Sequence, residues 1–224
     1  MIVAERKPFE EIKEMLKGYG KVLNVGCGGC TSICLSGGQK EVDLLNGELR
    51  DAFKANPAPL RIDGFTIERQ CNGDFYSDLD EMVPGYDAVL SMACGAGVQF
   101  LAERHPERPV FPALNTLFVG ADRDIGWYEE NCRSCGDCVL GEMGGICPVT
   151  RCAKSILNGP CGGTSLDGKC EVSKDTPCAW YEIYDRLKRQ GRLDLILKIK
   201  PAREWKNQTR KNLIHESFKK RYAK

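Results

Sequence analysis

Three cysteines separated by two-residue gaps are the most distinctive chemical feature of this sequence. They are Cys132, Cys135 and Cys138, and Cys147 follows with a proline directly after it. In iron-sulfur proteins a Cys-x2-Cys-x2-Cys loop brings thiolates to a cubane, and a distant cysteine followed by proline is a common further ligand. Four-thiolate zinc sites more often use separated pairs of cysteines. The spacing therefore favours a [4Fe-4S] cluster over zinc at this loop.

Four more cysteines follow at wide spacing, and these are Cys152, Cys161, Cys170 and Cys178. Their spacing leaves three interpretations open: a second cubane, a structural zinc site, or buried cysteines that pack as small hydrophobic residues. The surrounding segment is rich in glycine and proline and poor in large apolar residues. We expect metal binding, rather than burial, to order it.

Five cysteines belong to the first part of the chain, namely Cys27, Cys30, Cys34, Cys71 and Cys94. Cys27, Cys71 and Cys94 each come directly after a run that is expected to form a strand. Because the carboxyl ends of parallel strands share one edge of a sheet, these thiols should converge. The sequence predicts a second cluster there, with three thiolates from the loop at 27–34 and the fourth from either Cys71 or Cys94.

Two rival interpretations of the same loop are weaker. Gly26-Cys27-Gly28-Gly29 resembles the start of a dinucleotide-binding loop, but Thr31 stands where the third glycine of G-x-G-x-x-G belongs. A Cys27-Cys30 redox pair would leave the other three cysteines without a role.

The elements that must position these residues follow an α/β rhythm. Helical periodicity covers residues 9–18, 39–53 and 98–104, and strand-like runs cover residues 21–25, 60–68, 86–93 and 109–114. We expect a small, mostly parallel, Rossmann-like sheet flanked by helices over residues 1–125. A Cys-rich irregular metal-cluster module should follow at 126–180, and then a helical basic tail at 181–224.

Composition narrows the class of protein. The chain has 224 residues, of which 42% are hydrophobic and 28% charged, so disorder and collagen are excluded. No signal peptide is visible at the N-terminus, and no apolar run reaches the 18 residues that a membrane span needs. A cytoplasmic location is expected, where clustered cysteines bind metals or do redox chemistry more often than they form disulfides.

The basic tail and the few candidate acid-base residues give weaker indications of function. Residues 198–224 contain ten Lys or Arg against two Glu. Such a tail could wrap an acidic surface of this chain or of a partner, or remain a solvated helix. No nucleic-acid-binding motif accompanies it. His105 and His215 are expected to be exposed and the acidic stretch 74–81 to be a solvated loop, so no catalytic residue is predicted.

Several motifs resemble one known family. They are Ser91-Met-Ala-Cys94-Gly-Ala-Gly-Val-Gln99, Pro112-Ala-Leu-Asn-Thr116, Gly145-Ile-Cys147-Pro-Val-Thr-Arg-Cys152, Asn158-Gly-Pro-Cys161-Gly-Gly163 and Gly168-Lys-Cys170-Glu171. Over nearly its whole length the chain resembles the MetV-type family, the iron-sulfur small subunit of the methylenetetrahydrofolate reductase of acetogens and related bacteria.

The resemblance implies a place in one-carbon metabolism, in the Wood-Ljungdahl pathway or a relative of it. The chain would carry two or three [4Fe-4S] clusters, receive electrons from a donor protein and pass them to the flavin of a large partner subunit. That subunit would reduce 5,10-methylenetetrahydrofolate to 5-methyltetrahydrofolate. The alternative function is a zinc-stabilised scaffold that assembles the complex without carrying electrons, and a third is a thiol oxidoreductase.

Overall fold

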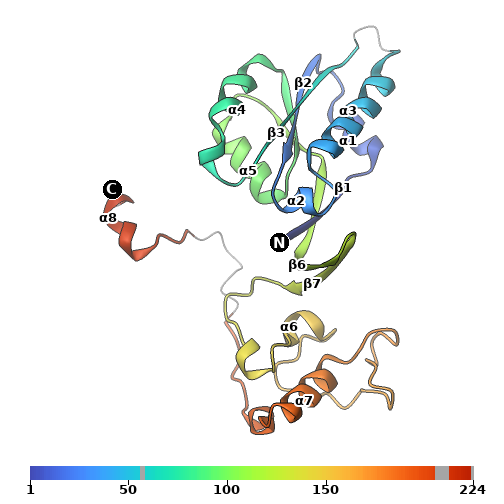
Figure 1. Ribbon diagram of the computed structural model, residues 1–224, viewed down its shortest axis with the longest axis vertical. Coiled ribbons are helices and arrows are strands. Elements are labelled where there is room, and N and C mark those ends of the chain that lie inside the picture. Colours follow the sequence, from blue (N-terminus) through green and yellow to red (C-terminus); the bar gives the residue numbers. More distant parts are fainter. Residues whose placement is uncertain (56–58, 205–211, 223–224) are drawn as a thin grey trace. The chain divides into compact units, whose positions relative to one another are not determined.

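The computed structural model describes residues 1–55, 59–204 and 212–222. The chain forms two compact units, Met1–Glu130 and Asn131–Lys224 (Figure 1). Within the described residues, no helix is both long and apolar enough to cross a membrane.

A four-stranded parallel sheet forms the centre of the first unit. Its strand order is β3-β2-β4-β5. The bounds are β2 (Lys21–Cys27), β3 (Arg61–Ile67), β4 (Ala88–Met92) and β5 (Val110–Pro112). Strands β2 and β4 are buried along nearly their whole length, as strands covered by helices on both faces must be. Their mostly apolar runs, interrupted by Asn24 and Ser91, explain why the sequence predicted them well.

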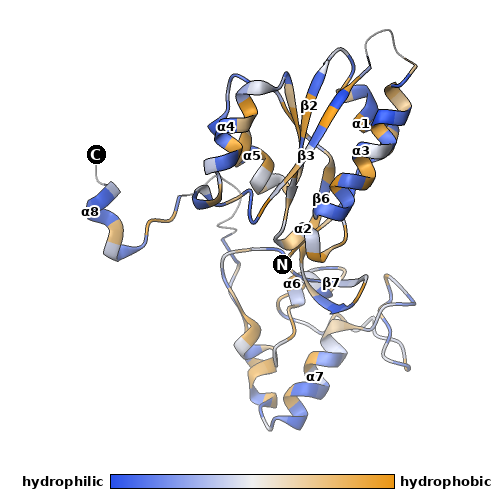
Figure 2. Ribbon diagram, turned by 45° about the horizontal axis from the view of Figure 1, so that its top comes forward, coloured by the Kyte–Doolittle hydropathy of each residue, from blue (hydrophilic) through white to orange (hydrophobic). Residues whose placement is uncertain are grey.

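Helices cover both faces of this sheet (Figures 1 and 2). Apolar residues of α1 (Phe9–Met15) and α3 (Gln39–Phe53) pack in one hydrophobic core, and those of α4 (Ser77–Met82) and α5 (Gly95–Arg104) pack in another. A short helix, α2 (Cys30–Ile33), follows β2. The predicted α/β class, with a mostly parallel sheet flanked by helices, is confirmed.

A separate antiparallel sheet was not predicted from the sequence. It has the order β1-β6-β7, with bounds β1 (Ile2–Arg6), β6 (Leu114–Asp124) and β7 (Trp127–Cys132). Most residues of β6 are exposed or half-buried, so the strand lacks the apolar alternation that identifies a strand with one buried face. The predicted boundary between residues 125 and 126 falls in the turn between β6 and β7.

The second unit is irregular except around one helix, α7 (Ala179–Arg189). Trp180, Ile183 and Leu187 of this helix pack against Met143 and Ile146 in a small core. Burial therefore contributes to ordering the Cys-rich segment, which we had expected metal binding alone to order. The sequence did not indicate this contribution, because Met143 and Ile146 lie singly within the segment and Ile183 and Leu187 follow it.

The remaining elements of the second unit are short. Helix α6 spans Pro148–Arg151, and 3-10 turns span Leu140–Glu142 and Leu193–Leu197. Part of the predicted helical tail, at 205–211 and 223–224, lies outside the described residues. The described part beyond 211 holds a 3-10 turn, Glu216–Phe218, and helix α8, Lys219–Tyr222.

The acidic stretch at 74–81 is not a loop, and His105 is not exposed. Asp80 lies on α4, where its carboxylate accepts hydrogen bonds from the guanidinium of Arg104 and pairs with His105 Nε2 at 2.9 Å. The His105 side chain is only 13% exposed. Arg104 and His105 lie at the end of helix α5, so their contacts with Asp80 connect α4 to α5.

Replacing Asp80 by Asn should therefore destabilise the chain in a pH-dependent way. The hydrogen bonds from Arg104 hold the pKa of Asp80 below its ordinary value. A lowered pKa in the folded state contributes stability above the unfolded pKa of about 3.9, and this stability is lost as the pH falls through the folded pKa. Denaturant unfolding should show Asp80→Asn less stable than wild type at pH 7, with the difference shrinking below about pH 4. The exposed Asp78→Asn on the same helix is the control, and a difference that does not change with pH would contradict the assignment.

Candidate functional site

The loop that carries Cys27, Cys30 and Cys34 is pinned to the ends of β2 and β4. The Cys27 N–H donates to the Gly37 carbonyl at 2.8 Å, and the Thr31 hydroxyl donates to the Met92 carbonyl at 3.1 Å. A side chain at Gly37 would overlap the Met92 carbonyl oxygen, so only glycine permits this close approach. The loop therefore cannot move away from the sheet edge without breaking these contacts.

Cys71 is positioned by Gln70, which is completely buried. The Gln70 Nε2 group donates to the carbonyls of Val25 at 2.8 Å and Gly26 at 3.1 Å, and its Oε1 accepts from the Ser91 hydroxyl at 2.6 Å. The Tyr76 hydroxyl donates to the Gln70 backbone carbonyl at 2.6 Å. One side chain thus joins the segment after β3 to the central strands β2 and β4.

Cys94 immediately precedes α5 and follows β4, next to the point where the order of strand addition reverses. The chain leaves β2 for β3 on one side and returns to β4 on the other, so the ends of β2 and β4 flank a topological switch point. Ligands bind in the crevice at such points in open α/β sheets. The Gly95 N–H donates to Thr116 Oγ1 at 2.8 Å, which fixes the start of α5 against β6.

Cys71 lies within electrostatic reach of three other cysteines of the first unit. The pKa of Cys71 is raised by partial burial and then by the charges of Cys94, Cys27 and Cys30, although the residue as a whole is exposed. Cys34 is different. Its Sγ lies 3.3 Å from the Ile2 carbonyl of β1, and burial is the main cause that raises the pKa of its thiol.

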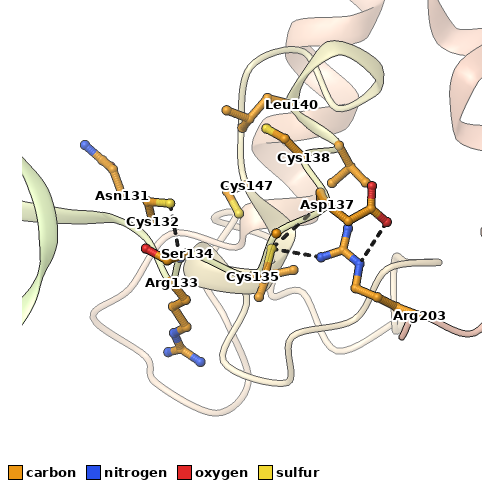
Figure 3. A pocket seen from close by; sticks show the side chains of 13 residues that line it. Asn131, Cys132, Arg133, Ser134, Cys135, Asp137, Cys138, Leu140, Cys147 and Arg203 are labelled. Atoms are coloured by element: carbon orange, nitrogen blue, oxygen red, sulfur yellow. Dashed lines mark hydrogen bonds and ion pairs between the residues drawn. The ribbon is translucent and has the colours of Figure 1, made fainter. Parts of the chain in front are cut away.

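The second unit brings four cysteines to one pocket of about 200 Å³. These are the four residues of the predicted cluster loop, Cys132, Cys135, Cys138 and Cys147 (Figure 3). Ser134 and Gly136 have left-handed backbone conformations, with φ of 51° and 84°, which turn the loop tightly between its cysteines. The Ser134 N–H donates to Cys132 Sγ at 3.3 Å.

The other four cysteines of this unit are not among the residues that line the pocket. Cys152 and Cys178 pack against the small core around α7. Thr164 Oγ1 lies 3.0 Å from Cys178 Sγ, and Cys161 Sγ lies 3.7 Å from Glu171 Oε1. Cys170 forms an isolated antiparallel bridge with Thr164. These contacts do not indicate which of the four thiols would bind the same metal site.

Across residues 1–55, 59–204 and 212–222, no three His, Cys, Asp or Glu side chains are arranged closely enough to hold a metal ion. The fit to an iron-sulfur cluster therefore rests on donor chemistry. All thirteen cysteines are free, and four of them surround one pocket. Thiolates are the ligands that such clusters use.

Sequence reasoning missed two residues that contact these sites. Gln70 had a weak signal, since it is a polar residue between a predicted strand and a cysteine. Arg203 had none, because its neighbours in sequence do not indicate that the chain returns to the cysteine pocket. Its guanidinium donates to Cys135 Sγ at 3.1 Å.

Replacing Gln70 by Leu should destabilise the first unit by about 1–3 kcal/mol, because buried polar groups of β2 and β4 would lose their hydrogen-bond partner. Denaturant unfolding measures the effect. Gln39→Leu is the matched control, since Gln39 lies on the surface of α3 and its amide donates to the exposed Asp43 side chain. Equal stability of the two variants would contradict the role of Gln70.

Comparison with known proteins identifies one part of the chain. Residues 111–206 match the family model described as methylene-tetrahydrofolate reductase C terminal. No curated protein and no solved structure matched the chain. The matched range contains the four-cysteine pocket, the other four cysteines of the second unit and Arg203. The resemblance found in the sequence is confirmed over residues 111–206, a little under half of the chain, which match the methylene-tetrahydrofolate reductase C-terminal domain family.

Proposed function

We propose that this chain is the iron-sulfur electron-transfer subunit of a methylenetetrahydrofolate reductase. The observation that carries the proposal is a pocket lined by four cysteines inside a domain of the methylenetetrahydrofolate reductase family. The Cys-x2-Cys-x2-Cys spacing of three of these cysteines is typical of [4Fe-4S] ligation. A second set of cysteines at the sheet edge of the first unit supports a second cluster.

We propose two ligand sets. The first is Cys132, Cys135, Cys138 and Cys147. The second is Cys27, Cys30, Cys71 and Cys94, which differs from the sequence-based set because it uses both Cys71 and Cys94 and leaves Cys34 out. A third cluster or a zinc site at Cys152, Cys161, Cys170 and Cys178 stays a prediction.

When bound, such clusters supply one-electron storage and transfer. The chain's own residues hold the thiols in place. Thr31 and Gln70 fix the backbone beside Cys27 and Cys71, and the turn at Ser134 and Gly136 shapes the second loop. Electrons would arrive from a donor protein and leave to the flavin of a large partner subunit, where 5,10-methylenetetrahydrofolate is reduced. Thirteen free thiols agree with a reducing, cytoplasmic environment.

The ligand assignment at the sheet edge predicts different results for neighbouring cysteines. Cys71→Ser and Cys94→Ser should each lose about four irons per chain, because a [4Fe-4S] cluster uses four cysteine ligands. Cys34→Ser should keep the wild-type iron and sulfide content, because its thiol is turned toward β1. Anaerobic purification followed by iron and sulfide analysis makes the comparison. Loss of iron in Cys34→Ser, with retention in Cys71→Ser, would reverse the assignment.

Electron transfer to a flavin tests the function itself. The chain is reduced anaerobically, freed of excess reductant and mixed with the flavin-carrying methylenetetrahydrofolate reductase subunit. We expect the absorbance of the oxidised flavin to disappear. Cys135→Ala should lose the cluster of the second unit and transfer more slowly. A fully iron-loaded, reduced chain that leaves the flavin oxidised would contradict the proposal.

A further inference from the structure

The second unit places a buried cation directly against the cysteine pocket. The side chain of Arg203 is 4% exposed, and its Nη1 donates to Cys135 Sγ at 3.1 Å. Its Nε lies 3.6 Å from the carboxylate of Asp137, which is 58% exposed. The guanidinium therefore lies closer to the sulfur of Cys135 than to the carboxylate of Asp137 (Figure 3).

The chain is held in this position by Asn158. Its Nδ2 group donates to the Lys200 carbonyl at 2.9 Å, and its Oδ1 accepts from the Lys200 N–H at 2.7 Å. The Lys200 ammonium also forms an ion pair with Glu142. These contacts fix the backbone three residues before Arg203 and direct the start of the basic tail along the cysteine loop. They also assign a structural task to Asn158, which belongs to one of the motifs noted in the sequence.

An arginine guanidinium is always charged in proteins. Burying such a charge is costly unless an anion lies beside it. Sulfur atoms that ligate an iron-sulfur cluster carry negative charge, and each added electron increases it. Hydrogen bonds to these sulfurs and nearby positive charge therefore favour the reduced form of a cluster.

We propose that Arg203 is a positioning and tuning residue that raises the reduction potential of the cluster held by Cys132, Cys135, Cys138 and Cys147. The inference rests on the proposed iron-sulfur function of this pocket. It assigns a task to one residue at the start of the basic tail. The cluster of the first unit, which has its own ligand set, should be insensitive to Arg203.

An EPR-monitored redox titration of the anaerobically purified full chain tests this inference, with iron content measured in parallel. In Arg203→Ala, one cluster signal should shift to a more negative midpoint potential while the other stays in place and the iron content is unchanged. Arg203→Lys should shift the same signal less, because the ammonium keeps the charge without the planar fork. Asn158→Ala should shift it in the same direction by releasing the backbone that holds Arg203.

Arg189→Ala is the matched control, because it also removes one positive charge from the second unit but its side chain is 75% exposed and pairs with Asp185 on α7. It should leave both potentials unchanged. Full iron content with both potentials unchanged in Arg203→Ala would overturn the inference, as would loss of iron in both Arg203→Ala and Arg203→Lys, which would make the residue purely structural. A wild-type chain without iron would overturn the proposed function instead.

Discussion

Clustered thiolates repel one another, so the backbone around them has to be held by contacts that do not involve sulfur. In the first unit this constraint is met at the carboxyl edge of a parallel sheet, where buried side chains tie the ends of three strands together. Gln70 bonds to β2 and β4 from the segment after β3, and Thr31 bonds the cysteine loop to the end of β4. The positions of Cys27, Cys71 and Cys94 follow from these bonds.

The second unit meets the same constraint with a small core and a returning chain. Residues within the Cys-rich segment and after it pack around α7, and Asn158 holds the chain near Lys200. The loop itself is turned by left-handed residues between its cysteines. The two units thus position thiols by different means, one by strand order and the other by local turns and a few tertiary contacts. Electron transfer by clusters at the two cysteine sets would need no acid-base residue.

Much of the fold could be predicted because parallel strands and their helices leave strong periodic patterns. The strands around Val25 and Leu90 are mostly apolar, and Ile12 and Leu16 mark a helix face. The antiparallel strand β6 was missed since its residues are largely exposed on both faces. The cysteine sets were visible from spacing, but Cys34 could not be separated from Cys30 by spacing alone, because its orientation depends on the contact with β1. Arg203 contacts a residue 68 positions away, which no local pattern encodes.

The central claim is that these cysteines hold iron-sulfur clusters that carry electrons. The most direct measurement is the content of iron, acid-labile sulfide and zinc per polypeptide in anaerobically purified chain, taken together with its visible spectrum. The account predicts about eight or more irons with matching sulfide and a brown protein with broad visible absorbance, as expected for two or three cubanes on thiolate ligands. Zinc without iron, in a colourless protein, would contradict it and would make the cysteine sites structural.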